Sequence, residues 1–407
     1  MAGPLSHIRV LDLSRVLAGP WASQTMADLG AEVIKIERPK VGDDSRAFGP
    51  PWLKDRAGRE STDSAYFTAA NRGKKSVTVN IAVPEGQELV RSLARKCDVL
   101  IENFKYGDLQ RYGLDYPALR KLNAGLVYCS LTGFGHTGPY RERPGYDFMI
   151  QGMGGMMSVT GEPDAAPGGG PQRAGVPIAD IITGMYASIA ICAALAHRAR
   201  SGAGQHLDLA LLDSQIALLA YQNTNYFATG RPPQRIGNLH PNIVPYQPFR
   251  TSDGQVILAC GNDNLYRKFC AAAGCPALAE DARFASNAAR VENRDELARL
   301  LSEIFARRST REWVDLLEGA GVPNGPINDL AQVFEEPQVK ARGIRFEMDH
   351  AVAGRLPLVA SPMRFSETPL EYRLPPPLLG EHTDEVLRSL LGKSDAEIAR
   401  LHAAGVL

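Results

Sequence analysis

The chain has 407 residues, of which 44% are hydrophobic and 22% are charged. This composition is typical of a globular protein, and a chain of this length is expected to form two domains of roughly 150–200 residues each. Its 45 lysines and arginines are balanced by 45 aspartates and glutamates. Because general nucleic-acid binding relies on an excess of positive charge, we expect no nucleic-acid partner.

The cysteines, the histidines and the apolar runs exclude further classes. The six cysteines form no CxxC pair, and the eight histidines form no HExxH motif. These patterns predict neither a disulfide framework nor a bound metal. The longest apolar run, around residues 185–196, is shorter than a bilayer span, and the first nine residues lack a signal-peptide core. We therefore expect a cytoplasmic protein with no membrane partner.

The first 135 residues alternate between short apolar runs and helical segments. The predicted strands are Ile8–Leu13, Val33–Ile36, Ser76–Ile81, Asp98–Glu102 and Gly125–Leu131, and the predicted helices are Ala22–Leu29, Pro84–Lys96 and Tyr116–Asn123. This alternation predicts βαβ units and a mostly parallel sheet. The carboxyl ends of such strands share one edge of the sheet, where ligands bind.

The composition of the rest of the chain changes at two points, first to a glycine-rich segment and later to a proline-rich one. A glycine-rich segment, Gly152–Gly175, is predicted to be a loop, and a long apolar helix at Ala179–Arg200 follows it. A strand at His206–Leu209 and a helix at Leu211–Ala228 come next. Prolines then interrupt the chain, and we expect a smaller second domain with a strand at Gln255–Ala259 and helices at Asp263–Ala273, Asn293–Ala306 and Thr310–Ala320. The final helical segments, Asp384–Leu391 and Asp395–Ala403, are expected to cap the first domain.

Two features of the sequence point to chemistry. Asp180 opens the long helix among apolar neighbours. An aspartate there can cap the helix, or it can act as a nucleophile in a partly dry pocket, and the residue pattern leaves both roles open. Basic residues also recur near the ends of the predicted strands, which favours a phosphorylated ligand. These residues are Arg15, Arg38, Arg72, Lys74, Lys75, Lys105, Arg111, Arg141 and Arg143.

Several longer motifs occur in a fixed order along the chain. They are VLDLSRVLAGP at 10–20, LGAEVIKIE at 29–37, DVLIENF at 98–104, GQHLDL at 204–209, GVPNGP at 321–326 and LGEHTDEVL at 379–387. Together they resemble the class III CoA-transferases, the family of formyl-CoA transferase and the carnitine CoA-transferases. The resemblance implies an α/β fold with a Rossmann-like large domain and parallel sheet from residues 1–225 and 331–407. It also implies a smaller α+β domain from residues 226–330 and an interlocked, ring-like homodimer.

The resemblance also assigns roles to single residues. Asp180 matches the family's nucleophile, and the helix terminus is expected to keep its carboxylate ionised. Leu17 stands where some members have glutamine. The backbone amides of Gly154 and Gly155 are candidates for stabilising an oxyanion. Coenzyme A contacts are implied for Val16, Leu17, Ala18, Arg38, Asn80, Asn103, Phe104, Lys105, Arg111, Arg143 and Tyr146.

These matches imply that the chain moves coenzyme A from an acyl-CoA donor to a carboxylic acid, through an aspartyl anhydride and an aspartyl-CoA thioester. Coenzyme A is then a substrate, and no permanently bound cofactor is expected. His240 and Tyr246, in the segment HPNIVPY, look like the branch that uses succinyl-CoA and dicarboxylic acceptors. A purely structural loop explains this segment equally well.

Two alternatives to CoA transfer stay open. The related α-methylacyl-CoA racemases carry a His-Asp pair where this chain has Tyr146-Asp147. Tyrosine has an ordinary pKa of about 10 and exchanges protons poorly near neutral pH, so this difference favours transfer over racemisation. The second alternative is a protein that binds coenzyme A without catalysis.

Overall fold

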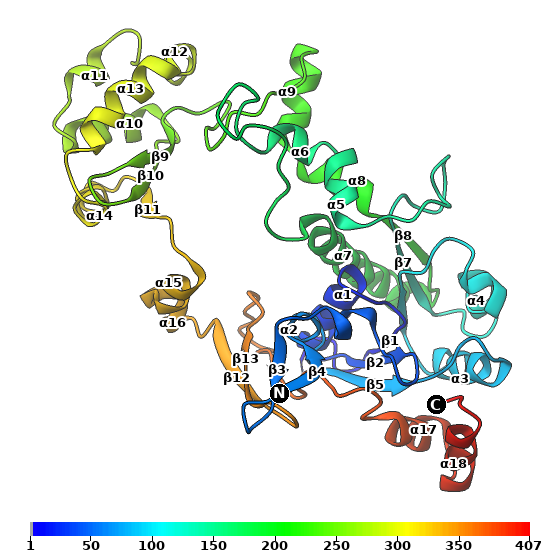
Figure 1. Cartoon of the computed structure of the whole chain (residues 1–407). Coiled ribbons are helices and arrows are strands. Elements are labelled where there is room, and N and C mark those ends of the chain that lie inside the picture. Colours follow the sequence, from blue (N-terminus) through cyan, green and yellow to red (C-terminus); the bar gives the residue numbers. More distant parts are fainter. Residues whose placement is uncertain (1–2) are drawn as a thin grey trace. The chain divides into compact units, whose positions relative to one another are not determined.

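A computed structural model describes residues 3–407 of the chain (Figure 1). The chain forms two compact units. The first comprises Met1–Met156, Ala174–Thr229 and Lys340–Leu407, and the second comprises Met157–Arg173 and Gly230–Val339. Relative to the expected boundaries at 225/226 and 330/331, the second unit ends nine residues later and also takes in residues 157–173.

The first unit is built on a six-stranded sheet. Its strands, in spatial order, are β5 (Lys74–Thr78), β2 (Glu32–Glu37), β1 (Arg9–Asp12), β6 (Val99–Glu102), β7 (Val127–Thr132) and β8 (His206–Ala210). Every neighbouring pair is parallel, which confirms the predicted parallel sheet. The chain order reverses between β1 and β6. In open parallel sheets, ligands bind beyond the carboxyl ends of the strands at this reversal point.

Helices cover both faces of this sheet because successive strand residues point to opposite sides. Leu11 of β1 belongs to one buried cluster and Val10 to the other. The Leu11 face is covered by α3 (Pro84–Ala94), α4 (Tyr116–Arg120), α17 (Thr383–Leu391) and α18 (Asp395–Ala403). The other face is covered by α1 (Ala18–Asp28) and α7 (Ile178–Ser201). Figure 1 shows α17, from the end of the chain, beside α3 and β5.

The helix α7 is longer than the apolar run suggested. It has 24 residues and, by length and composition alone, could cross a membrane, although 44% of its most apolar stretch is buried within the structure. The expectation that this segment is too short to span a bilayer was therefore wrong. One side of the helix, with Ala187, Ile191 and Ala194, packs into the core beneath the sheet.

Two further predictions about local structure were wrong. The start of the glycine-rich segment is helical, with α5 at Asp147–Met153 and α6 at Met156–Val159. The single helix expected at Leu211–Ala228 is split into α8 (Leu211–Leu218) and α9 (Tyr221–Thr229). The break lies at Ala220, whose φ of 44° is incompatible with a right-handed helix.

The second unit has its own antiparallel sheet and core. The sheet consists of β9 (Tyr246–Arg250), β10 (Gln255–Ala259) and β11 (Asn324–Pro326). The main helices packed with it are α10 (Asp263–Ala272), α13 (Arg294–Phe305) and α14 (Thr310–Gly319). Phe305 stacks on Phe249 with ring centroids 4.6 Å apart, and Trp313 packs against it at 4.5 Å.

Short elements complete the chain. They are the 3₁₀ turns η1 (Asp44–Ala47) and η2 (Leu109–Tyr112), the helices α2 (Ala65–Thr68), α11 (Ala277–Glu280), α12 (Asn287–Glu292), α15 (Leu330–Glu335) and α16 (Pro337–Ala341), and the hairpins β3–β4 (Trp52–Lys54 and Glu60–Ser64) and β12–β13 (Arg345–His350 and Gly354–Val359).

Candidate functional site

Two adjoining pockets lie at the carboxyl edge of the parallel sheet, where the loops after its strands meet. Arg15, Phe104 and Asp108 line both pockets, so the two form one continuous groove. One pocket, here called the Asp180 pocket, is lined among others by Val16, Leu17, Ala18, Asn103, Phe104, Lys105, Arg143, Tyr146 and Asp180. The other, the Arg38 pocket, is lined among others by Arg38, Asn80, Phe104 and Arg111. The fold thus brings all the candidate coenzyme A residues and Asp180 to one groove.

Asp180 is the third residue of α7, and the N-cap position is occupied by Pro177. Asp180 therefore does not cap this helix, which removes one of the two roles that the residue pattern had left open. The capping side chain is Asp147, the first residue of α5. Its Oδ1 accepts hydrogen bonds from the backbone N–H of Ala179 at 2.8 Å and of Asp180 at 3.4 Å. Gln151 holds the other carboxylate oxygen, with Nε2 donating to Oδ2 at 2.7 Å.

The carboxyl group of Asp180 does not titrate like an ordinary aspartate. Burial raises its pKa, and the negative charge of Asp147 raises it further, to about 7. The expectation that the helix terminus keeps Asp180 ionised was thus wrong, because these two effects outweigh it. At neutral pH both the protonated and the ionised forms of Asp180 are therefore populated.

Tyr66 belongs to the electrostatic surroundings of Asp180, although the sequence pattern did not single it out. Burial raises the pKa of Tyr66 to about 12, and the negative charges of Asp180 and Asp147 contribute to the shift. Its hydroxyl therefore stays protonated at neutral pH and can donate a hydrogen bond.

The loop after β1 is tied to the loop after β6 by one side chain. The amide of Asn103 bonds the backbone of Arg15 twice: Oδ1 accepts from the Arg15 N–H at 2.8 Å, and Nδ2 donates to the Arg15 carbonyl at 2.7 Å. Both loops thereby keep a set position at the point where the chain order reverses. The side-chain amide of Asn103 is therefore occupied by its hydrogen bonds to Arg15, although Asn103 also lines the Asp180 pocket.

The arginines of the groove are held by acidic partners. Asp44 pairs with Arg15 at 3.0 Å and with Arg38 at 2.6 Å, and Asp108 pairs with Arg111 at 2.5 Å. The Arg15 guanidinium also lies 5.1 Å from the centre of the Phe104 ring. Asp44 and Asp108 were not among the predicted site residues. Their signal in the sequence is weak, since a single aspartate near an arginine is common on protein surfaces.

Residues 5–383 match the family model described as CoA-transferase family III. The chain belongs to this family. It is 51% identical over 387 residues to the succinate–glutarate CoA-transferase of Agrobacterium fabrum, covering 95% of this chain and 96% of the relative. It is 42% identical to the succinyl-CoA:glutarate CoA-transferase of Mus musculus, covering 99% of this chain and 90% of the relative. The crystal structure of a CAIB/BAIF family protein from Brucella suis superposes with a TM-score of 0.83 at 50% identity, covering 96% and 100% of the two chains.

Two of the predicted site residues of this CoA-transferase, the glycines proposed to stabilise an oxyanion, lie outside the groove. Gly154 and Gly155 line neither pocket of the groove. The N–H of Gly154 donates to the carbonyl of Ile150 at 2.7 Å, so the end of α5 already uses this amide. Tyr146, by contrast, lines the Asp180 pocket and keeps 72% of its surface exposed.

His240 and Tyr246 belong to the second unit of the transferase. Their rings meet edge to face with centroids 5.3 Å apart. Burial lowers the pKa of His240, and the nearby charge of Arg294 lowers it further, so the imidazole is neutral at pH 7. Across residues 3–407, no three His, Cys, Asp or Glu side chains are grouped in a way that could hold a metal ion.

Proposed function

We propose that the chain is a succinyl-CoA:dicarboxylate CoA-transferase with Asp180 as its nucleophile. The observation that carries this proposal is the placement of Asp180 in the groove shared with the candidate coenzyme A residues. The relatives named above are succinate–glutarate transferases, which supports succinyl-CoA as the donor and a short dicarboxylic acid as the acceptor.

The reaction starts at the Asp180 carboxylate. One of its oxygens attacks the thioester carbonyl of succinyl-CoA, which gives a mixed aspartyl anhydride and releases the coenzyme A thiolate. The thiolate then attacks the aspartyl carbonyl, which forms an aspartyl-CoA thioester and releases succinate. Attack requires the ionised form of Asp180, and a carboxylate with a pKa of about 7 is a stronger nucleophile than one at 3.8.

The acceptor acid reverses these steps. Its carboxylate attacks the carbonyl of the aspartyl-CoA thioester, which forms a second anhydride and frees the thiolate. The thiolate attacks the acceptor's carbonyl carbon, and the products are the new acyl-CoA and the Asp180 carboxylate. Over the full cycle one thioester is broken and one thioester is formed, so the transfer needs no external energy source or permanently bound cofactor.

The groove offers the chemistry that coenzyme A requires. The Arg38 pocket contributes Arg38 and Arg111 for phosphate groups, and arginine suits phosphate recognition because its planar donors bind two oxygens at once. The Asp180 pocket contributes the apolar Leu17 beside Lys105 and Arg143. A pantetheine chain running from the Arg38 pocket would carry its sulfur toward Asp180.

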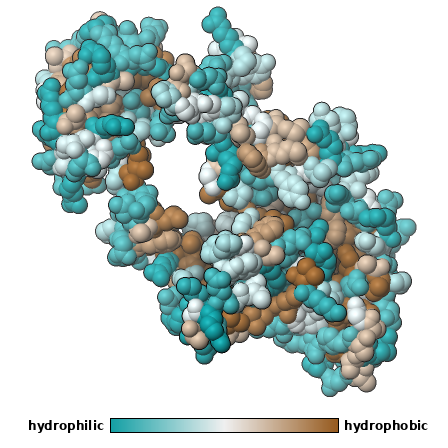
Figure 2. All heavy atoms as spheres, viewed as in Figure 1, coloured by the Kyte–Doolittle hydropathy of each residue, from teal (hydrophilic) through white to brown (hydrophobic). Residues whose placement is uncertain are grey.

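We further propose that two chains form the interlocked homodimer. Apolar residues are visible on the surface of the molecule (Figure 2). On α7, α8 and α9 they include Ile189, Ile216 and Phe227, which are 62%, 45% and 75% exposed. Apolar side chains gathered on neighbouring helices are typical of an interface between subunits. Sedimentation equilibrium is expected to show a dimer at micromolar concentration, and a monomer would contradict this part of the proposal.

Trapping the covalent intermediate tests the function directly. The protein is incubated with succinyl-CoA and no acceptor, and its intact mass is measured. We expect an adduct of coenzyme A less one water, located on Asp180 by peptide mapping. Addition of glutarate should remove the adduct and produce glutaryl-CoA.

Three variants and one side reaction complete this test. Asp180→Asn and Asp180→Ala should lose turnover by at least roughly a thousandfold while they still bind coenzyme A. Asp213 is a matched control, because it is likewise the third residue of its helix, α8, and is exposed. Asp213→Asn should form the adduct normally. Near-normal turnover in Asp180→Asn, or deuterium exchange at the acyl α-carbon without any transfer, would contradict the proposal.

A further inference from the structure

Val16 has a backbone conformation that is unusual for its residue type. Its φ is +69°, in the left-handed region, whereas a β-branched residue strongly prefers negative values. Such a conformation is strained and persists only where neighbouring groups stabilise it. Val16 lies directly before Leu17 and Ala18, and all three line the Asp180 pocket.

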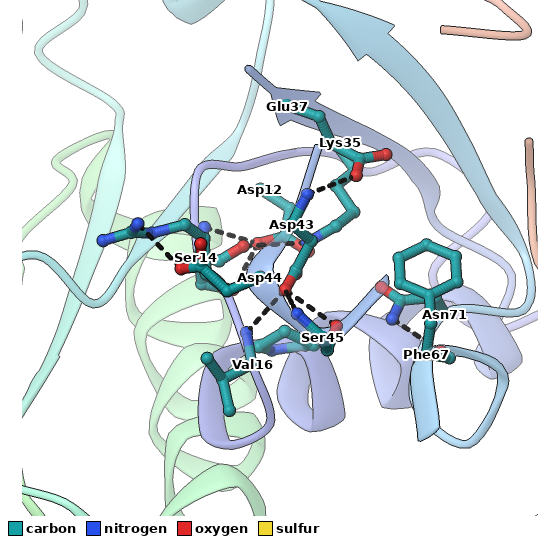
Figure 3. Close-up of polar contacts among 12 residues, drawn as sticks. Asp12, Ser14, Val16, Lys35, Glu37, Asp43, Asp44, Ser45, Phe67 and Asn71 are labelled. Atoms are coloured by element: carbon teal, nitrogen blue, oxygen red, sulfur yellow. Dashed lines mark hydrogen bonds and ion pairs between the residues drawn. The ribbon is translucent and has the colours of Figure 1, made fainter. Parts of the chain in front are cut away.

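The backbone N–H of Val16 is bound by the carboxylate of Asp43 (Figure 3). Its Oδ1 accepts from the N–H of Val16 at 3.0 Å and from the N–H of Ser45 at 2.9 Å. Its Oδ2 lies 2.8 Å from the Nζ of Lys35, and neither side chain is exposed to solvent. Lys35 also donates to the carbonyl of Ser14 at 2.8 Å. The buried pair therefore contacts the loop after β1 on both sides of Arg15, at Ser14 and at Val16.

Asp43 and Lys35 carry opposite charges, and each stabilises the ionised form of the other. Burial by itself would raise the pKa of Asp43, but Lys35 and the backbone N–H groups lower it well below its usual range. Burial would likewise lower the pKa of Lys35, but the charges of Asp43 and Asp12 raise it above its usual value. Both groups stay ionised at neutral pH, and their buried ion pair fixes the position of the Asp43 carboxylate.

We propose that Asp43, anchored by Lys35, is a positioning residue that holds Val16 in its left-handed conformation and so shapes the wall of the Asp180 pocket against which acyl-CoA binds. This inference rests on the proposed function. Asp43 also lines the Arg38 pocket, although its side chain is fully buried. Its neighbour Asp44 holds Arg15 and Arg38, so one short segment sets both the backbone wall and the arginines of the groove.

Glycine at position 16 provides the test, because it adopts a positive φ without strain. Asp43→Asn is made in the native chain and in the Val16→Gly variant. In the native chain we expect kcat/KM for succinyl-CoA to fall by roughly 10–100-fold, since misplacing a pocket wall by an ångström has effects of this size. In the Val16→Gly background the same substitution should cost threefold or less. The KM for the acceptor acid should change little in either case.

Equal losses in both backgrounds would overturn the proposal, because Asp43 would then act on stability alone. Ser45→Ala is the matched control: it removes another donor to the same carboxylate, from Oγ at 2.7 Å, and should have a small effect in both backgrounds. If Asp43→Asn does not fold, Asp43→Ser is compared in the same two backgrounds. Failure of both variants to fold even with Val16→Gly would also overturn the proposal.

The dissociation constant of free coenzyme A, measured by calorimetry, separates this inference from the proposed function. If the native chain transfers no coenzyme A to any dicarboxylic acid, the proposed function fails, but the two-background comparison of coenzyme A affinity still applies. If transfer occurs and the affinity loss from Asp43→Asn is the same in both backgrounds, only the positioning role fails.

Discussion

Asp147 caps the helix that carries Asp180, with its Oδ1 2.8 Å from the N–H of Ala179 and 3.4 Å from the N–H of Asp180 itself. The two residues are 33 positions apart in the chain. The same carboxylate that stabilises the start of α7 raises the pKa of Asp180 through its negative charge. The stability of α7 and the pKa of Asp180 therefore both depend on the carboxylate of Asp147.

The activity of the native protein should depend on pH through Asp180. Since attack needs the carboxylate and its pKa is about 7, kcat/KM should rise with pH between about 6 and 8 and then level off. The measurement is a pH–rate profile with succinyl-CoA and a dicarboxylic acceptor. A profile that is flat from pH 5 to pH 8 would contradict the pKa assignment.

Asp147→Asn separates the charge of Asp147 from its hydrogen bonds. Asparagine still accepts a bond from the start of α7 through Oδ1, but its negative charge is gone, so the pKa of Asp180 should fall. We expect the midpoint of the pH–rate profile to move below that of the native protein.

Asp147→Ala is the companion variant, because it removes the cap as well. It should shift the profile in the same direction and lower the free energy of unfolding by about 1 kcal/mol, a typical value for a lost cap. An unchanged midpoint in both variants would show that burial alone sets the pKa of Asp180.

Asp180→Asn should be more stable than the native protein at neutral and alkaline pH. The folded-state pKa of Asp180 is about 7 against an ordinary 3.8, so its contribution to stability is complete below pH 4 and is lost as pH rises to 7. Asparagine does not titrate, and the difference should grow between pH 4 and pH 7 to about 2 kcal/mol, a value discounted for the partial exposure of the group. Urea unfolding at several pH values measures it. A constant difference would contradict this prediction.

Asp44 and Arg38 should affect coenzyme A binding in opposite directions. Arg38→Gln removes one cation from the groove and should weaken binding roughly fivefold, with a weaker dependence on salt. Asp44→Asn removes the anion that competes with ligand phosphates for Arg15 and Arg38, and it should strengthen binding. Arg59, which pairs with Asp55 outside the groove, is the control residue. Calorimetry at two salt concentrations measures the affinity of each variant for coenzyme A. A change in the same direction in both variants would contradict the prediction.

Gly133→Ala should disturb the Asp180 pocket from the loop after β7. A Cβ at position 133 would lie 2.5 Å from the Cα of Gly145, which is closer than atoms of two backbones can approach. The loop between them carries Arg141 and Arg143 along the pocket wall. We expect loss of stability and of coenzyme A affinity together. Gly319→Ala, where a Cβ meets nothing within 4 Å, is the control and should lower neither.

The parallel strands were the most predictable part of the fold, because each is a short run of buried apolar residues. The hairpin strands were missed for the opposite reason. Glu60–Ser64 consists of polar and small residues, and Arg345–His350 buries only alternate side chains. The candidate groove could be predicted because the residues after parallel strands meet at one edge. The contacts within it could not, because Asp43 and Asp44 have no local pattern that distinguishes them from surface acids, and the motif that contains Asp147 does not indicate its contact with α7.

The sequence by itself determined the parallel sheet, the edge at which its loops meet and the family to which the chain belongs. These depend on apolar periodicity and on motifs that are local in the chain. Only the tertiary structure decided that Asp147 rather than Asp180 caps α7, that Asp180 has a raised pKa, and that Asp43 holds Val16. These properties depend on burial and on charges brought together from distant positions, 27 residues apart for Asp43 and Val16. Electrostatic energy depends on the distance between charges in space and on the exclusion of water, and neither can be derived from the order of residues alone.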